Sequence, residues 1–409
     1  MELLAPAGTL EKARIALRYG ADAVYMGVPG FSLRAGAEPP PDAAGLRALK
    51  KEYPRSRLYG AINRFVHQRD LARLEAALQN LRELPLDALI LSDLGLLEPV
   101  RRVLPEMELH LSTQANCTNA EAARMYGRLG FTRIVLAREL TLPEIREICD
   151  AVPDVEIELF VHGAMCMAYS GRCFLSLEMT GRSANAGDCA HSCRWHYAVV
   201  EEKRPGVYYP VEQGEDFLSV FSSRDLMLLD DLDAIRDAGV RSVKIEGRMK
   251  SALYTAVTTR AYRAALDGAP CRDLWRGQLF TIPHRPYTRG FVMDDATVHA
   301  PSTDANETEY RMMGIIGTVL AKSADQGGTV HTLIVKNRIS RDVAVDVLLP
   351  DGTILTDWMP DLRDGEGVPV PDAIQGRPAF LCLPPELRGS NGEYGIIRAR
   401  RAFTVATGR

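Results

Sequence analysis

Residues 133–161, RIVLARELTLPEIREICDAVPDVEIELFV, contain two short apolar runs with a helical segment between them. The runs 133–136 and 156–161 are rich in aliphatic and β-branched side chains, as strands buried in a sheet are. Between them, Thr141-Leu142-Pro143-Glu144 has the form of a capping box, with proline at an early helical position that needs no backbone N–H. The stretch therefore predicts a strand, a helix and a second strand parallel to the first.

The same alternation recurs through the first 270 residues. Further strands are expected at 2–5, 23–26, 57–62, 88–91, 108–112 and 242–245. Further helices are expected between residues 10 and 20, 70 and 84, 119 and 130, 226 and 238, and 251 and 266. Eight strands with continuous apolar runs favour an α/β fold of the closed (β/α)8 TIM-like barrel type over residues 1–270. An open doubly wound sheet is the alternative, although Ala5-Pro6-Ala7-Gly8-Thr9 after the first strand is not G-x-G-x-x-G.

From Arg311 onward the pattern changes to strands alone. Short β-rich runs occupy 314–320, 329–335, 343–349, 353–356, 379–383 and 395–398. Asp351-Gly352 is a hairpin turn signal between two of them. These features predict a C-terminal all-β domain over residues 306–409, folded as a small β-barrel and joined to the first domain by a connecting segment, 271–305.

Composition excludes several classes of protein. The chain has 409 residues, 46% hydrophobic and 25% charged, which is typical of globular proteins and not of disordered, collagen-like or coiled-coil chains. No apolar stretch approaches the roughly 18 residues of a membrane span, and the N-terminus lacks a basic signal-peptide region, so we expect a cytoplasmic protein. The net charge of −4 gives no general attraction to nucleic acid, so a polyanion would have to bind a local basic patch.

Four of the eight cysteines fall within 28 residues, in an insertion (residues 164–220) after the seventh strand. Cys166, Cys173, Cys189 and Cys193 have the spacing C-x6-C-x15-C-x3-C. Four thiols on one excursion from the barrel mouth can converge on a single metal centre. Structural zinc sites usually contain C-x2-C pairs, whereas iron–sulfur clusters are held by four thiolates at looser spacing. The spacing favours an iron–sulfur cluster, with zinc and unliganded thiols as the alternatives.

Polar side chains gather where the predicted strands end, which is where TIM-like barrels place their functional groups. Such residues include Asn63, Gln114, Arg138, Glu139, His162, Glu246 and Arg248. Lys244 lies inside the last strand, where a solvated side chain is not expected. It is therefore either an inward-facing functional group or a buried ion-pair partner.

The connecting segment combines arginines with aromatic residues. Arg272, Arg276, Arg285, Tyr287 and Arg289 lie here, with Asp273 as the single acid between residues 272 and 292. Cations interleaved with aromatic rings suit phosphate contact and base stacking on single-stranded RNA. A solvated arginine-rich linker is the alternative interpretation.

The run from Phe160-Val161-His162-Gly163 through Cys166 to Ser170-Gly171-Arg172-Cys173 resembles the signature of the collagenase-like peptidase family, number thirty-two of those with unknown catalytic type. Supporting segments lie throughout the chain, and the resemblance covers both domains. They include Leu3-Leu4-Ala5-Pro6-Ala7-Gly8, Ser112-Thr113-Gln114-Ala115-Asn116, Lys244-Ile245-Glu246-Gly247-Arg248 and His284-Arg285-Pro286-Tyr287.

The resemblance implies an activity different from the family's name. Several members are implicated in hydroxylation, with a four-iron four-sulfur cluster on four such cysteines and a dependence on prephenate. Their substrates are the wobble uridine of tRNA, a cytidine of ribosomal RNA, and a ubiquinone precursor. The two-domain layout is most similar to the tRNA hydroxylation members, whose product is 5-hydroxyuridine. It implies an oxidoreductase that acts on tRNA and not on a membrane, and it is compatible with an accessory or related family subunit.

The resemblance suggests the role of the four cysteines, and placement at the strand ends suggests the roles of the other candidates. Cys166, Cys173, Cys189 and Cys193 would ligate the cluster. Arg138, Lys244 and Arg248 would hold a dicarboxylate such as prephenate, because carboxylates pair well with arginine forks. Gln114, Glu139, His162 and Glu246 would orient the base or move protons. The basic connecting segment and the β domain would hold the RNA.

Two other functions are alternative hypotheses. A peptidase, as the family name says, would need an activated nucleophile or an open metal site, and the sequence contains neither G-x-S-x-G nor H-E-x-x-H. A non-catalytic RNA-binding protein with a structural metal is the third hypothesis.

Overall fold

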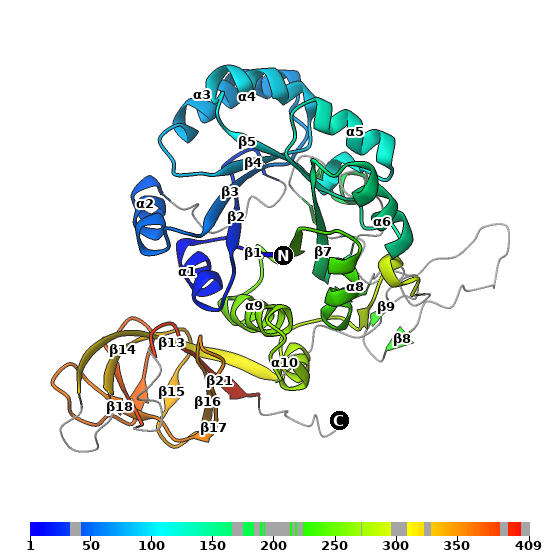
Figure 1. Cartoon of the computed structure of the whole chain (residues 1–409). Coiled ribbons are helices and arrows are strands. Elements are labelled where there is room, and N and C mark those ends of the chain that lie inside the picture. The colour runs from blue at the N-terminus through cyan, green and yellow to red at the C-terminus, as the bar shows by residue number, and fades with distance from the viewer. Residues whose placement is uncertain are drawn as a thin grey trace, which may run out of the picture.

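A computed structural model describes residues 1–32, 42–165, 175–183, 189–190, 192, 213–214, 217–218, 224–270, 272–295, 309–322, 329–384 and 392–401. Its first part is a closed barrel of eight parallel strands, seen end-on in Figure 1. Each strand pairs with the next along the chain, and the barrel closes because the last strand pairs with both the seventh and the first. The barrel strands are β1 (Glu2–Pro6), β2 (Ala23–Gly27), β3 (Arg57–Ile62), β4 (Ala88–Leu91), β5 (Glu108–Leu111), β6 (Arg133–Val135), β7 (Glu156–Ala164) and β11 (Ser242–Ile245).

Helices cover the outside of the barrel (Figure 1). They are α1 (Leu10–Arg18), α2 (Ala43–Glu52), α3 (Leu71–Leu81), α4 (Leu97–Val103), α5 (Ala120–Arg128), α6 (Leu142–Ala151), α8 (Leu232–Asp237) and α9 (Ala252–Leu266). Their starts follow the capping chemistry that the sequence predicts. The Thr9 and Asn119 side chains accept hydrogen bonds from backbone N–H groups of the first turn, and the Thr141–Glu144 capping box is present.

Two of these helices are absent from the expectations above. α2 buries only Leu46 and Leu49, so its apolar face gives a weak periodic signal. α4 is only seven residues long and carries Pro99 in its first turn.

The segment expected to be helical from residue 226 instead begins with a short strand, β10 (Asp225–Met227), and α8 starts only at Leu232. β10 pairs antiparallel with the end of β7, with Asp225 opposite Ala164, and it pairs with β12 (Tyr287–Thr288) on its other side. Pairing between distant segments has here overridden the local helical pattern. The cysteine-rich excursion therefore leaves and returns at adjacent points on the barrel rim. Its described elements are α7 (Leu175–Thr180), β8 (Gln213–Gly214) and β9 (Phe217–Leu218).

The C-terminal part is an antiparallel sheet of seven strands in the order β17-β16-β21-β13-β14-β20-β18. The strands are β13 (Tyr310–Lys322), β14 (Thr329–Val335), β16 (Val345–Leu348), β17 (Ile354–Trp358), β18 (Asp361–Arg363), β20 (Phe380–Leu383) and β21 (Ile396–Arg400), and β15 (Ile339–Ser340) pairs with β19 (Asp372–Ala373). The all-β prediction is confirmed. Within the described residues, the end strands β17 and β18 do not pair with each other, so the sheet is a half-barrel rather than a closed one.

The half-barrel packs against the outer helices of the (β/α)8 barrel, beside α9 and α10 (Arg272–Leu279) (Figure 1). Ile315, Leu348 and Ile396 of the sheet belong to the same apolar core as the barrel helices. The Tyr19 hydroxyl on the barrel side donates a hydrogen bond to Leu348 O at 2.7 Å. A shared core and buried hydrogen bonds hold the two parts in one orientation. No helix in the described parts of the chain is long and apolar enough to cross a membrane.

Candidate active site at the C-terminal end of the barrel

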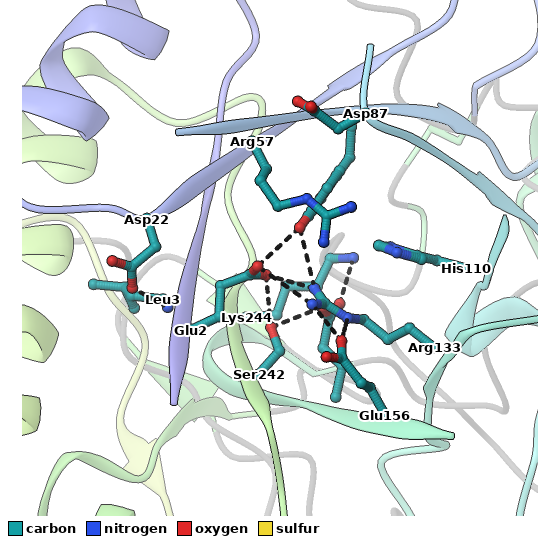
Figure 2. Close-up of polar contacts among 12 residues, drawn as sticks. Glu2, Leu3, Asp22, Arg57, Asp87, His110, Arg133, Glu156, Ser242 and Lys244 are labelled. Carbon is teal, nitrogen blue, oxygen red and sulfur yellow. Dashed lines mark hydrogen bonds and ion pairs between the residues drawn. The ribbon is translucent and has the colours of Figure 1, made fainter. Parts of the chain in front are cut away.

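A network of charged groups fills the barrel interior near the beginnings of its strands. Figure 2 shows Glu2 of β1, Arg133 of β6, and Ser242 and Lys244 of β11 pointing toward one another. The centre of the network is Glu158 of β7, a fully buried residue. Its carboxylate accepts hydrogen bonds from Lys244 Nζ at 3.0 Å, Ser242 Oγ at 3.0 Å and Arg133 Nη1 at 3.2 Å.

These contacts set the charge states of the barrel interior. Burial alone would raise the pKa of Glu158, but attraction to Lys244 and Arg133 outweighs it and lowers the pKa to about 2. Burial lowers the pKa of Lys244, and the Glu158 carboxylate acts against that shift. Of the two roles considered for Lys244, the structure shows the buried ion pair. Its Nζ also lies 4.5 Å from the Tyr25 ring centroid, and the residue lines the pocket described next.

A pocket lies directly above this network, at the carboxyl ends of the strands. Its lining includes five of the seven residues proposed above as catalytic or dicarboxylate-binding: Gln114, Arg138, Lys244, Glu246 and Arg248. The other lining residues are Tyr25, Ala61, Asn63, Ile90, Ser112, Thr113 and Phe160. The free space between these side chains is about 50 Å³, below the roughly 300–1,000 Å³ of typical ligand pockets. A ligand therefore enters only if the long side chains of the lining rotate.

Two polar atoms of this pocket have no partner within the described structure. The Arg138 guanidinium lies 4.1 Å from the Phe160 ring centroid and donates from Nη1 to Ala164 O at 2.6 Å, yet its buried Nε donates to nothing. The buried Oε1 of Gln114 likewise accepts no hydrogen bond. Buried polar groups are normally satisfied, so one donor and one acceptor here are available to a ligand.

The loop after β11 supplies the opposite wall of the pocket. Arg248 is buried and donates from Nη1 to Ser32 Oγ at 2.5 Å, with its guanidinium 5.6 Å from the Tyr25 ring centroid. The backbone at Glu246 lies so close to β7 that a Cβ on Gly163 would be 2.7 Å from Glu246 O. Gly163 also has φ +103°, which only glycine adopts readily. Glycine at this position lets the end of β7 and the loop after β11 approach each other.

His162 does not reach the pocket, which corrects its placement with the catalytic candidates. It lies among the rings of Tyr254, Tyr262 and Tyr287, and its Nδ1 is 3.3 Å from the Tyr262 hydroxyl. The cause is an irregularity in the pairing of β7 with β11: Lys244 is opposite Phe160, but the next residue, Ile245, is opposite His162. Side chains on a regular strand alternate between its two faces, and this irregularity lets His162 point away from the pocket that Phe160 lines. Burial lowers the pKa of His162 to about 3, so the imidazole is neutral at physiological pH.

Glu139 is half-buried in the loop after β6 and is also absent from the pocket lining. Burial raises its pKa. It follows Arg138 in the chain, and attraction to the Arg138 guanidinium partly offsets the effect of burial on the Glu139 pKa.

Three of the four clustered cysteines, Cys166, Cys173 and Cys193, lie outside the described residues. Cys189 is described and is half-buried. The neighbouring Ala190 N–H donates to Ser176 Oγ of α7 at 2.9 Å, which places Cys189 against that helix. A hydrogen bond holds the start of the excursion at the barrel rim, because Ala164 O, two residues before Cys166, accepts from Arg138 Nη1.

The basic connecting segment is largely neutralised by acids from another part of the chain. Arg285 is buried and pairs with Asp225 at 2.6 Å. Arg272, Arg276 and Arg289 pair with Asp233, Asp230 and Asp231, respectively. Asp230 and Asp231 lie between β10 and α8, and Asp233 lies in the first turn of α8. Tyr287 is partly buried, stacks on His284 with ring centroids 4.4 Å apart, and donates from its hydroxyl to Leu279 O. RNA binding by this segment stays a prediction. Of its four paired arginines, only Arg289 keeps a side chain more than half exposed, at 54%.

Sequence reasoning missed the residues that hold the pocket cations. The Tyr25 ring contacts Lys244 and Arg248, and the Phe160 ring contacts Arg138. In the sequence, an aromatic residue of a buried strand that binds a cation looks the same as one that only packs in the core. Glu158 could have been found, because it lies two positions before Phe160 on one face of β7 and is a rare acid within an apolar strand.

Comparisons with known proteins agree on the family. The family model described as "Peptidase family U32" matches residues 8–300. The "tRNA hydroxylation protein P" of Escherichia coli (strain K12) is 34% identical over 94% of both chains, and the "tRNA hydroxylation protein P1" of Bacillus subtilis (strain 168) is 42% identical over 66% of this chain and 64% of its own. The "23S rRNA 5-hydroxycytidine C2501 synthase" of Escherichia coli (strain K12) is 41% identical over 65% of this chain and 39% of its own. The chain belongs to peptidase family U32.

Proposed function

We propose that this protein is an RNA hydroxylase that forms 5-hydroxyuridine at the wobble uridine of tRNA. The observation that carries the proposal is the end-to-end similarity to the Escherichia coli tRNA hydroxylation protein, which includes both the barrel and the C-terminal half-barrel. Similarity to the ribosomal RNA enzyme covers about two thirds of this chain and a minor part of that enzyme. Hydroxylation of a ribosomal cytidine or of another substrate is therefore the second choice.

The pocket suits a small anion with two carboxylates, and we propose prephenate as a co-substrate or ligand. Lys244 is balanced by Glu158, whereas Arg138 and Arg248 lie above that pair and add positive charge around the opening. The unpartnered Arg138 Nε offers a donor for a carboxylate oxygen, and guanidinium–carboxylate pairs are strong and directional. This fit rests on the donor set present in the pocket.

The same lining offers groups that can orient a uracil. The ring presents an acceptor–donor–acceptor edge, and the Gln114 side-chain amide has both a donor and an unpartnered acceptor to match part of it. Glu246 lines the same space and supplies a carboxylate as the candidate proton acceptor there. Glu139 stays a candidate for proton transfer only because its pKa is raised. We propose that His162, which packs among three tyrosine rings, stabilises β7.

The proposed cluster ligands remain Cys166, Cys173, Cys189 and Cys193, with a four-iron four-sulfur cluster as the expected cofactor. The half-buried position of Cys189 is compatible with thiolate ligation. A bound cluster would supply one-electron transfer. The position of β7 and β10 supports this arrangement, because they pin both ends of the excursion at the rim where Arg138 lies.

Hydrolysis of proteins is less well supported by the pocket. The Thr113 hydroxyl donates to Leu136 O at 2.9 Å, and Ser112 Oγ accepts from Gln114 N at 3.3 Å. In the described part of the pocket, neither hydroxyl is hydrogen-bonded to a histidine or carboxylate that could activate it.

Nucleoside analysis of tRNA from a deletion strain tests the proposal. We expect nucleosides derived from 5-hydroxyuridine to disappear and to return with a plasmid copy of the gene. A plasmid encoding Arg138→Gln is expected to restore less than a tenth of them, because the guanidinium would no longer reach the ligand. Arg102→Gln, on the exposed face of α4, is the matched control and is expected to restore the wild-type amount. Unchanged nucleosides in a deletion strain without a second family member would refute the function.

A further inference from the structure

A second hollow lies on the C-terminal half-barrel, away from the barrel pocket. It is a groove of about 650 Å³, and four arginines line it: Arg311, Arg338, Arg400 and Arg401. The remaining lining is apolar apart from Ser340 and consists of Met313, Ile339, Val343, Val345 and Ala399. The groove therefore combines an apolar floor with a basic rim.

The strand register explains why these residues meet. β13 and β21 run antiparallel with Arg311 opposite Ala399, so Arg401, two positions after Ala399, lies on the same face of the sheet. Val345 of β16 continues this face on the other side of β21, because Asp346 is opposite Arg398. Arg398 lies on the opposite face and is bound to Thr281 and Gln278 beside the barrel. The groove thus occupies the face of the sheet that is turned away from this contact.

The charge of the groove differs from that of the protein as a whole. The chain carries a net charge of −4, yet no acid is among the described residues that line the groove. Arg338 pairs with Asp372 at 2.7 Å and Arg400 lies 3.5 Å from Glu309, but both arginine side chains are about 70% exposed, at 70% and 68%. In the described structure, Arg311 and Arg401 are exposed and form no ion pair. Each guanidinium has five donors, so all four retain N–H groups for a partner.

Attachment of the half-barrel to the barrel makes this surface relevant to the substrate. Besides the Tyr19 contact, Lys336 pairs with Glu11 of α1 at 2.9 Å, and Arg260 of α9 donates to Asp351 O at 2.9 Å. These contacts hold the half-barrel, and with it the groove, against the barrel that contains the pocket. A large substrate that reaches the pocket could therefore bind both sites at once.

We propose that this groove is a docking site for the sugar–phosphate backbone of tRNA. The inference rests on the proposed function and adds to it the surface that holds the RNA outside the pocket. Arginine forks match phosphate oxygens, and most contacts that position a nucleic acid are made to its backbone. The apolar floor, including Val343, which is 52% exposed, offers packing for ribose and base edges. It replaces the largely neutralised connecting segment as the principal RNA-binding surface.

Binding of an unmodified tRNA transcript to the full-length chain tests this site. Fluorescence anisotropy between 50 and 200 mM salt would give both Kd and the slope of log K against log salt. Removing two phosphate contacts in R311Q/R401Q is expected to raise Kd about tenfold and to reduce the magnitude of the slope by roughly 1.5. R311K/R401K is expected to keep most of the affinity, because lysine still neutralises a phosphate.

The matched control removes two arginines from outer barrel helices. R102Q/R124Q changes the net charge equally at exposed positions on α4 and α5, and we expect Kd to change less than twofold with the slope unchanged. In turnover assays, R311Q/R401Q is expected to raise KM for tRNA while kcat stays at the wild-type value.

Equal Kd and slope for wild type and R311Q/R401Q would overturn the docking site. So would loss of binding to anionic phosphatidylglycerol vesicles in R311Q/R401Q with tRNA affinity unchanged, which would assign the groove to a membrane surface. Neither result bears on the hydroxylase proposal, because that proposal stands or falls on the nucleosides of the deletion strain.

Discussion

Replacing Glu158 with glutamine keeps the size of the side chain and removes the charge at the centre of the barrel network. The wild-type carboxylate accepts hydrogen bonds from Lys244, Ser242 and Arg133. Arg133 would keep Glu2 and Glu156 as partners, whereas Glu158 is the one ion-pair partner of Lys244 in the described structure. The substitution thus leaves a buried ammonium group without a counter-charge.

The expected cost can be obtained in two ways that agree. Removing one member of a buried ion pair typically costs about 3–5 kcal/mol. Lowering of the Glu158 pKa from 4.5 to about 2 corresponds to about 3 kcal/mol of folding free energy. Because the folded-state pKa is the lower one, this stability is fully present above about pH 4.5 and is lost as the pH falls through about 2. We therefore expect Glu158→Gln to reduce the free energy of unfolding at pH 7 by about 3 kcal/mol.

Urea denaturation at pH 7, followed by far-UV circular dichroism, measures this loss. Glu75→Gln is the control, because it breaks the exposed pair with Arg102 and should cost less than about 0.5 kcal/mol. Glu158→Gln/Lys244→Met should recover most of the loss, because it removes both buried charges. A cost below about 1 kcal/mol for Glu158→Gln alone would refute the conclusion that this ion pair organises the floor of the pocket.

Three further predictions concern other parts of the molecule. The folded-state pKa of His162, about 3, lies below its unfolded value of 6.5, so wild-type stability should decline as the pH falls from 6.5 toward 3. His162→Phe should show a shallower decline in acid denaturation, and an identical pH profile would contradict this. Tyr19→Phe removes the hydroxyl that donates to Leu348 O and should cost about 1–2 kcal/mol, seen as a lower Tm; an unchanged Tm would show that this contact does not help to hold the two parts together. Cys189→Ser should at least halve iron and acid-labile sulfide per chain in anaerobic preparations, whereas Cys149→Ser should leave both unchanged; equal iron in wild type and Cys189→Ser would exclude Cys189 as a ligand.

Much of the architecture could be predicted from local patterns. Apolar runs separated by capped helices identified all eight barrel strands, and the change to strands alone identified the all-β C-terminal part. Such patterns work because the side-chain periodicity of a strand or helix and its capping chemistry depend on neighbours within a few residues. Short elements with weak periodicity, such as α2, α4 and β10, were missed for the same reason.

The barrel also predicted where polar side chains would gather. Gln114, Arg138, Glu246 and Arg248 end their strands or follow them, and parallel strands bring those ends to one rim. The sequence alone could not predict which face of a strand a side chain lies on where the pairing with the neighbouring strand is irregular. His162 left the pocket because of an irregularity between β7 and β11, and that irregularity depends on the partner strand.

What the sequence by itself determined is the order and type of the major elements, the family signature, and the rim on which a site would form. Only the tertiary structure decided which charges are free. Arg285 looks available along the chain, yet Asp225, sixty residues earlier, neutralises it. Arg311 and Arg401 lie ninety residues apart, yet they share one groove. Coulomb attraction and burial act through space, so the charge that remains for a ligand is fixed only when the chain has folded.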